Sequence, residues 1–290
     1  MRILIIANSK VVFGKELQLE LNNKGFDVSL LDFEFLTMYD KNYNENTTFS
    51  ELFRKYKSIP KFSMFFRMIY IKKVIQENKF DIINIHISRW FYLIILPWLL
   101  KQKLIITFYG SDFYRTSSFI KNIQKLLYKK AHVITFTNPL TKKSFIEYYK
   151  GFENKSYVCR FGLKTLDFID KNRDISKKVL RELLGYDLEK IIVTCGYNST
   201  KEQQHGKIVE NILKLPKDLL ERIQFIFPMT YGDSVHKEKI KDILNQTNLD
   251  YIVLEEFLYG DNNANIKLAS DIMINILETD SFSGSMQEFL

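Results

Sequence analysis

The chain has 290 residues, of which 46% are hydrophobic, which is enough apolar material for two cores and too much for a disordered protein. Its two cysteines, Cys159 and Cys195, form no C-x2-C motif and no paired framework, which indicates a reducing compartment and argues against structural zinc. The formal net charge of +8 is a moderate excess without a nucleic-acid recognition motif, so we expect no nucleic-acid partner.

Strand and helix signals alternate along the chain, which predicts an α/β fold with parallel sheets covered by helices. In the first half, strands are expected at residues 2–7, 26–32, 81–87, 103–108, 132–136 and 156–160, with helices at 14–23, 61–78, 90–100 and 119–130 and a loop at 39–50. In the second half, strands are expected at 190–195, 224–228, 251–254 and 271–276, with helices at 204–215, 235–247 and 263–270.

The pattern divides the chain into two Rossmann-like domains. Residues 1–163 are predicted to form the N-terminal domain, 164–189 a polar linker region with a helix at 176–185, and 190–290 the C-terminal domain. A last helix starting near Ser285 has little more than one turn before Leu290, and so short a helix cannot bury a face alone. We therefore expect the natural protein to continue and the second domain to be incomplete.

The end of the chain is the first candidate binding site. Its last strand leads through a polar turn into a helix, which places free N–H groups and a positive helix end at a strand's carboxyl edge, where phosphates bind. Asp280 and Glu288, one before this helix and one in its first turn, can face the same ligand. Ser285 and Glu288 also fit a capping box, in which Glu288 satisfies only a backbone donor.

Other chemically suited residues follow earlier strands. DIINIHI ends near His86, ITFYGSD carries Tyr109 and Asp112, and CGYNSTKEQQHGKI carries Lys201 and His205. A tyrosine has a reference pKa of about 10 and is no ordinary base near neutral pH, so a base would have to be Asp112 or His86. Asp112 also fits a simple helix cap. The first strand lacks the G-x-G-x-x-G turn that a dehydrogenase needs.

Together these motifs resemble the GT-B glycosyltransferases, in particular the family-4-like enzymes with an E-x7-E motif and a T-x-H-G-S-D loop. Tyr109 stands at the family's histidine, Tyr197 at its donor-loop arginine and Asp280 at its first glutamate. The resemblance implies two doubly wound domains facing a cleft, with 1–163 on the acceptor side and 190–290 binding the nucleotide sugar. It also implies a metal-independent transfer without a cofactor. The residues that it implies are Asp112, His86, Tyr109 and Asp280 for catalysis, Lys201, His205, Thr230, Tyr231, Gly284, Ser285 and Glu288 for the donor, and Gly14, which also fits a simple turn, on the acceptor side.

The leading hypothesis is transfer of a sugar from a nucleotide-diphosphate sugar to a glycan or lipid-linked acceptor, as in surface-polysaccharide biosynthesis. Alternatives are another GT-B activity, such as nucleotide-sugar epimerisation, and a non-catalytic nucleotide-sugar-binding protein.

The sequence also bears on where such an enzyme would act. The chain opens with a strand and not a signal peptide, and the apolar run at 90–100 is too short to span a bilayer, so a cytoplasmic protein is expected. Basic residues alternate with aromatic ones at 54–73 and 119–130, which suits an anionic membrane surface at the inner face of the plasma membrane. Two ordinary amphipathic helices would have the same composition.

Overall fold

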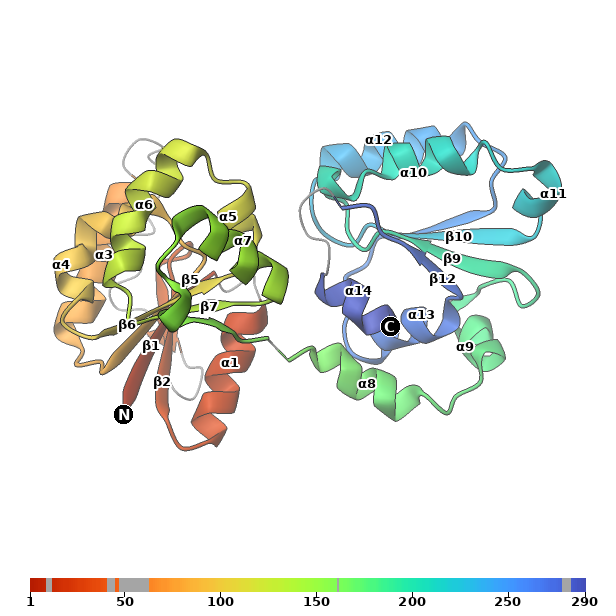
Figure 1. Cartoon of the computed structure of the whole chain (residues 1–290). Helices are drawn as coiled ribbons and strands as arrows, with labels where there is room; N and C mark the ends of the chain where they lie inside the picture. The colour runs from red at the N-terminus through yellow and green to blue at the C-terminus, as the bar shows by residue number, and fades with distance from the viewer. Residues whose placement is uncertain (9–11, 41–44, 47–62, 161, 278–282) are drawn as a thin grey trace. The chain divides into compact units, whose positions relative to one another are not determined.

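The structure is a computed structural model that describes residues 1–8, 12–40, 45–46, 63–160, 162–277 and 283–290. The chain divides into two compact units, Met1–Gly162 and Leu163–Leu290, each with a sheet covered by helices (Figure 1). The predicted α/β fold class is confirmed. The division falls at Gly162, next to the expected boundary at residue 163.

Among the described residues, the first unit has an eight-stranded sheet in the order β4-β3-β2-β1-β5-β6-β7-β8. The strands are β1 (Arg2–Ala7), β2 (Asp27–Asp32), β3 (Thr37–Tyr39), β4 (Glu45–Asn46), β5 (Ile82–His86), β6 (Lys103–Phe108), β7 (Val133–Phe136) and β8 (Ser156–Val158). They pair in parallel except at β2–β3 and β3–β4. The expected loop at 39–50 thus contains the end of β3 and all of β4, and its other residues beyond 40 lie outside the described ranges.

Helices cover this sheet because its strands are apolar on both faces. The helices are α1 (Val12–Asn23), α3 (Ser63–Glu77), η1 (Trp90–Ile95), α4 (Leu96–Leu99), α5 (Ser111–Tyr114), α6 (Ser118–Lys130), α7 (Pro139–Tyr149) and η2 (Glu153–Lys155). Alternate residues of β1 point to opposite faces, so Ile3 and Ile5 belong to the cluster beside α1 while Leu4 and Ile6 belong to the larger cluster on the other face. The single helix expected at 90–100 is instead a 3-10 helix followed by α4, which starts with a proline in its first turn.

The second unit has a parallel four-stranded sheet in the order β11-β10-β9-β12. Its strands are β9 (Ile191–Cys195), β10 (Ile223–Pro228), β11 (Tyr251–Leu254) and β12 (Ile272–Ile274). Its helices are α8 (Lys164–Asn172), α9 (Lys177–Leu184), η3 (Lys201–Gln203), α10 (His205–Ile212), α11 (Lys217–Leu220), α12 (Ser234–Asn245), α13 (Asp261–Ala269) and α14 (Gly284–Phe289). In Figure 1, α10 and α12 cover one face of this sheet, and α9 and α13 lie on the other.

The segment 164–189, expected as a linker region with a helix at 176–185, forms α8 and α9 and belongs to the second unit. Its polar side chains are used for packing: the Asn172 amide donates to Asp261 Oδ1 at 2.8 Å and to Asn265 Oδ1 at 2.9 Å, both on α13. Arg181 on α9 is buried and pairs with Asp271 just before β12. The polar composition therefore reflects a hydrogen-bonded interface and not a free connection.

Both sheets reverse their strand order once, and ligands of such sheets bind at the carboxyl edge beside the reversal. In the first unit the reversal lies between β1 and β5, and in the second it lies between β9 and β12. The loops that leave these strands are therefore the places to look for a site. No helix within the described ranges is long and apolar enough to cross a bilayer.

Candidate functional site

In the first unit, a ladder of polar side chains crosses β7, β6 and β5 and ends at Tyr109. The Thr135 hydroxyl donates to Thr107 Oγ1 at 2.8 Å, and the Thr107 hydroxyl donates to Asn84 Oδ1 at 2.9 Å. Asn84 Nδ2 lies 3.1 Å from His86 Nε2, and His86 Nδ1 lies 2.7 Å from the Tyr109 hydroxyl. As placed, the amide donates to Nε2, so the imidazole proton is on Nδ1 and points at Tyr109.

Burial fixes the charge of this pair. His86 is fully buried, and desolvation lowers its pKa to about 4, so the ring is neutral at pH 7. Burial raises the pKa of Tyr109 far above its usual value, with Asp112 adding to the shift, so the phenol stays protonated. The predicted catalytic residues His86 and Tyr109 thus lie together as a neutral hydrogen-bonded pair.

Asp112 lies beside this pair but faces the backbone. Its Oδ1 accepts the N–H groups of Tyr109 at 3.0 Å and Gly110 at 3.1 Å, and its Oδ2 accepts the N–H of Ser88 at 3.1 Å. Burial raises the pKa of Asp112 to about 6, against these donors, which lower it. The carboxylate therefore joins the loops after β5 and β6. It is not the side-chain cap that the sequence left open, because the N-cap of α5 is Gly110 and no side chain caps that helix.

Gly14 does not occupy the acceptor-facing loop in which the sequence placed it. It lies in the first turn of α1, where a Cβ atom would come within 3.0 Å of Ala7 Cβ and 3.5 Å of Leu30 Cδ1. The missing side chain therefore lets the helix pack closely on β1 and β2. A different residue strains the backbone beside the polar ladder. Ile87, which follows His86 at the end of β5, is β-branched and has φ of 65°.

In the second unit, the loops after β9 and β10 are joined into one surface. The Ser199 N–H and hydroxyl both donate to the Tyr231 carbonyl, at 2.8 and 3.0 Å. Gly232 has φ of 128°, and a Cβ there would lie 2.9 Å from Ser199 Oγ and from Thr200 N. Only glycine fits where the loop after β10 passes so close to the loop after β9. The Asn198 amide also reaches the Tyr231 hydroxyl at 3.5 Å.

Lys201 lies on this surface, whereas His205 does not. The Lys201 side chain is 75% exposed, and its Nζ lies 3.6 Å from Asp233 Oδ2. His205 is fully buried, with its ring 6.2 Å from that of Phe227 and 5.8 Å from that of His236. Burial, with His236 adding to it, lowers the pKa of His205 to about 4. The imidazole lies in the core, away from the surface at which a phosphate could reach it.

Gly196 explains why His205 is buried. Gly196 follows β9 with φ of 69°, and a Cβ there would lie 2.8 Å from His205 Nε2 and 2.9 Å from Gln203 Oε1. Its N–H donates to Ile274 of β12 at 2.9 Å. The first turn of α10 therefore packs directly under the loop at the reversal of strand order.

At the end of the chain, Glu288 makes a buried ion pair. Its Oε2 lies 3.0 Å from Lys267 Nζ on α13, and the two side chains are only 10% and 6% exposed. The same Nζ donates to Asn263 Oδ1 at 2.6 Å. Ser283, and not Ser285, caps α14 by accepting the Met286 N–H at 3.2 Å, so the capping-box alternative is wrong.

The remaining predicted donor residues lie, like Tyr231, at the carboxyl edge of the second sheet. Thr230, Gly284 and Ser285 are half-buried, and Glu288 is close enough to contribute to the raised pKa of Tyr231, whose main cause is burial. Asp280 lies outside the described residues. Within the described ranges, no group of three His, Cys, Asp or Glu residues is placed to hold a metal ion.

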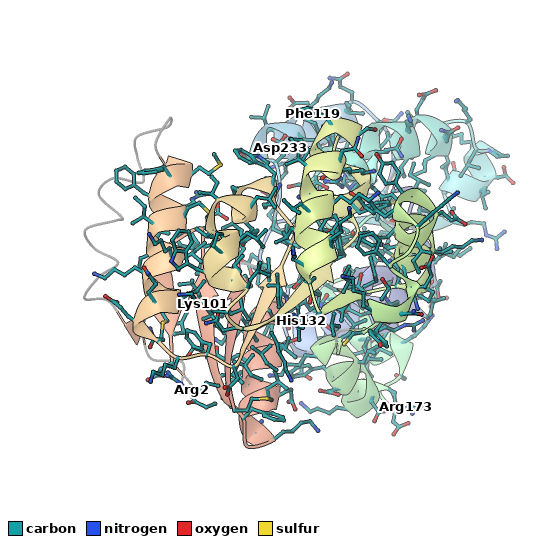
Figure 2. The ribbon with its side chains drawn as sticks, turned by 60° about the vertical axis from the view of Figure 1, so that its left-hand side comes forward. Arg2, Lys101, Phe119, His132, Arg173 and Asp233 are labelled. Atoms are coloured by element: carbon teal, nitrogen blue, oxygen red, sulfur yellow. The ribbon has the colours of Figure 1, made fainter. Side chains whose placement is uncertain are left out.

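A cavity of about 580 Å³ lies elsewhere, at the amino edge of the first sheet, lined by Lys101 and His132 among others. Figure 2 shows Arg2, Lys101 and His132 toward one end of this unit and Phe119 toward the other. The amino edge is not where ligands of wound sheets bind, and His132 Nδ1 there accepts the Leu104 N–H. We therefore assign the candidate sites to the carboxyl edges.

Comparison with known proteins agrees with this architecture. Residues 2–138 match the family model described as glycosyl transferase 4-like. A glycosyltransferase from Rickettsia africae superposes with a TM-score of 0.63 at 17% identity, over 99% of this chain and 77% of that one. The chain has the GT-B fold. The predicted fold is thereby confirmed.

Two other GT-B structures show how broad the similarity is. HepE from Anabaena, in complex with UDP-glucose, gives a TM-score of 0.60 at 13% identity over 95% of this chain and 73% of that one. UDP-N-acetylglucosamine 2-epimerase from Rickettsia bellii gives 0.59 at 11% identity over 96% and 79%. No curated protein matches the sequence. Identities this low show the fold and leave the reaction to be argued from the site.

Several residues at the GT-B strand edges were missed by the sequence reasoning. Asn84 and Thr107 fix the orientation of His86, and Lys267 pairs with Glu288. Asn84 was detectable, because it faces the same side of β5 as His86 two residues later. Lys267 gave no signal, because a lysine in a short polar helix ordinarily points to solvent.

Proposed function

We propose that this chain is a glycosyltransferase that moves a sugar from a nucleotide-diphosphate sugar to an acceptor. The observation that carries the proposal is the convergence of Lys201, Tyr231 and Glu288 at the carboxyl edge of the second sheet, beside its reversal of strand order. HepE, which shares the fold, was solved with UDP-glucose, and this supports a uridine nucleotide as the first donor to try.

In the proposed reaction, the bond between the anomeric carbon and the diphosphate oxygen breaks while the acceptor oxygen bonds to that carbon. The diphosphate leaves with the bond's electron pair, and the Lys201 ammonium stabilises its growing negative charge. Glu288 orients the donor, and the amides of Gly284 and Ser285 are further donor-binding groups. Because a cation of the chain meets the diphosphate, the proposal needs no metal ion.

The first unit would contribute hydrogen bonding and not a strong base. His86 is neutral at pH 7, and Tyr109 keeps its proton, so the pair can orient a sugar hydroxyl. Asp112 directs both oxygens at backbone N–H groups. This arrangement disfavours the epimerase alternative, which needs extra acid and base groups.

We further infer that the acceptor is lipid-linked and that α6 meets an anionic membrane surface. Phe119 is 73% exposed and Leu126 is 50% exposed, and the two lie seven residues apart, on one face of the helix. Lys129 and Lys130 are exposed at its end. Apolar side chains next to lysines fit a leaflet with anionic headgroups. Membrane contact would place the protein at the inner face of the membrane, as surface-polysaccharide synthesis requires.

The function is tested by incubating the chain with UDP-glucose and related UDP-, GDP- and dTDP-sugars and measuring release of the nucleoside diphosphate. We expect slow release by hydrolysis, unchanged by EDTA and lost in Glu288→Ala. An epimerised nucleotide sugar without diphosphate release would identify an epimerase, and binding without turnover would identify a binding protein. Either result would overturn the proposal.

A further inference from the structure

The polar ladder of the first sheet is a chain of hydrogen bonds that all run in one direction. It starts on β7, where the Thr135 hydroxyl donates to Thr107 Oγ1 of β6 at 2.8 Å, and Thr107 in turn donates to Asn84 Oδ1 of β5 at 2.9 Å. Thr135 and Thr107 are partners in the parallel register, so their side chains lie on the same face of the sheet. Each hydroxyl therefore turns its proton toward β5.

Asn84 passes this direction on because one end of its amide accepts and the other donates. The oxygen accepts the Thr107 proton, so the nitrogen, which can only donate, is the atom that lies 3.1 Å from His86 Nε2. A ring nitrogen that accepts a hydrogen bond carries no proton, so the proton of the neutral ring is on Nδ1, 2.7 Å from the Tyr109 hydroxyl oxygen. That oxygen accepts the ring proton, and the O–H of Tyr109 points in another direction.

Burial makes the position of the ring proton matter. His86 is fully buried, and desolvation lowers its pKa to about 4, so at pH 7 the ring has a single proton to place on one of two nitrogens. With the proton on Nδ1, Tyr109 can donate its own proton outward. With the proton on Nε2, Tyr109 would donate inward to Nδ1 and could only accept from a ligand. The residue that selects the tautomer of His86 therefore decides what Tyr109 offers.

We propose that Asn84 is a positioning residue: by holding the ring proton of His86 on Nδ1, it makes the Tyr109 hydroxyl a hydrogen-bond donor toward the substrate. The inference rests on the proposed function and deepens it, because it assigns the chemistry of the group that Tyr109 meets. That group is a hydrogen-bond acceptor, such as the oxygen of a sugar hydroxyl. A ladder that served stability alone would need only that each buried polar group be paired, whichever way the bonds run.

The test reverses the direction of the ladder without removing a bond. Asn84→Asp has the same shape and still accepts from Thr107, but its second oxygen cannot donate, so His86 keeps this bond only with a proton on Nε2. We expect the nitrogen chemical shifts of the His86 ring, assigned by comparison with His86→Gln, to show a protonated Nδ1 in the unaltered chain and a protonated Nε2 in Asn84→Asp. Release of the nucleoside diphosphate should fall by about tenfold, with the affinity for UDP within about twofold of the unaltered chain's.

A second variant changes the ladder without adding a charge. Thr107→Val removes the proton that fixes the Asn84 oxygen, so the amide can turn over and both tautomers of His86 should be populated. Thr107→Ser keeps the hydroxyl and should restore the single tautomer. The matched control is Asn78→Asp, the same substitution between α3 and β5, where the amide donates to the Val74 carbonyl. This control should leave the ring nitrogens of His86 and the rate of release unchanged.

The outcomes separate this inference from the proposed function. A proton on Nε2 in the unaltered chain, or the same tautomer in Asn84→Asp as in the unaltered chain, would overturn the role of Asn84. A changed tautomer with an unchanged rate of release would overturn it as well. If the unaltered chain releases no nucleoside diphosphate, the proposed function fails, and the chemical shifts still decide whether Asn84 places the proton. A melting temperature measured for each variant identifies loss of folding, and Thr107→Val then decides in place of Asn84→Asp.

Discussion

At the scale of single residues, the buried ion pair with Lys267 gives Glu288 a role in stability besides its proposed role in donor binding. Both side chains are nearly buried, so removing the lysine leaves a carboxylate without its counter-charge. We expect Lys267→Met to lower the free energy of unfolding by about 3 kcal/mol and the double variant Lys267→Met, Glu288→Met to recover much of that loss. Neither variant should bind a nucleotide sugar as the unaltered chain does. Urea unfolding and calorimetric titration measure the two effects.

The control for this prediction is an exposed pair of the same type. Lys214 Nζ, in the turn after α10, lies 2.9 Å from Oε1 of Glu210 in that helix, and the two side chains are 62% and 68% exposed. Lys214→Met should change the free energy of unfolding by no more than about 1 kcal/mol. Equal effects at Lys267 and Lys214 would show that the buried pair has no special role.

The raised pKa of Asp112 predicts in which direction the free energy of unfolding changes with pH. Its pKa in the folded chain is raised to about 6, above the ordinary value of 3.8, so the folded state binds more protons between these values. Its contribution to stability is then fully present below pH 3.8 and is lost as the pH rises through 6. The unfolding free energy of the unaltered chain minus that of Asp112→Asn should therefore grow as pH falls from 7 to 4, by up to about 3 kcal/mol. A difference that shrinks over this range would mean that the N–H donors outweigh burial.

Residue types at the site were predicted better than residue roles. His86, Tyr109 and Tyr231 were identified because polar residues stand out at the end of an apolar strand or just after it, and Glu288 was identified by its spacing from Asp280. The partners of these residues could not be predicted, because packing between separate segments decides which side chains meet. Glu288, for example, pairs with Lys267, which lies 21 positions earlier in the chain. His205 was misplaced for the same reason, since only the close approach of Gly196 shows that its ring points into the core.

At the scale of elements, the turn after β9 depends on the absence of a side chain at Gly196. Alanine there would combine a φ of 69° with contacts under 3.0 Å to His205 and Gln203. We expect Gly196→Ala to lower the free energy of unfolding by about 1–3 kcal/mol and to weaken nucleotide binding. Gly206→Ala is the matched control, because Gly206 lies within α10 with open space around it and should be neutral or slightly stabilising. Thermal unfolding of both variants compares them, and an unaffected Gly196→Ala would count against a rigid turn.

The helix α6 carries the prediction about membranes. Phe119→Glu with Leu126→Glu removes its exposed apolar side chains, and we expect this variant to lose binding to vesicles that contain an anionic phospholipid. Vesicles of neutral phosphatidylcholine serve as the control and should bind the unaltered chain weakly. Co-sedimentation measures both, and binding that persists in the variant would contradict a role for this face.

The strands were predicted more reliably than the connections. The runs at residues 2–7 and 103–108 coincide with β1 and β6 because a buried parallel strand is apolar throughout. In the segment 164–189 the helix expected at 176–185 is α9, whereas α8 was not expected. The segment was taken for a linker because its asparagine and arginine side chains pack through hydrogen bonds, which hydrophobic periodicity does not detect.

At the scale of the whole molecule, we propose that the nucleotide sugar binds at the carboxyl edge of the second sheet. Hydrogen exchange of the backbone amides, measured with and without saturating UDP-glucose, tests this most directly, because it reports which segments a ligand protects. We predict protection of residues 196–201 and 229–233, with none around Lys101 and His132 at the amino edge of the first sheet. Protection confined to that amino edge, or none at all, would contradict binding at the carboxyl edge of the second sheet.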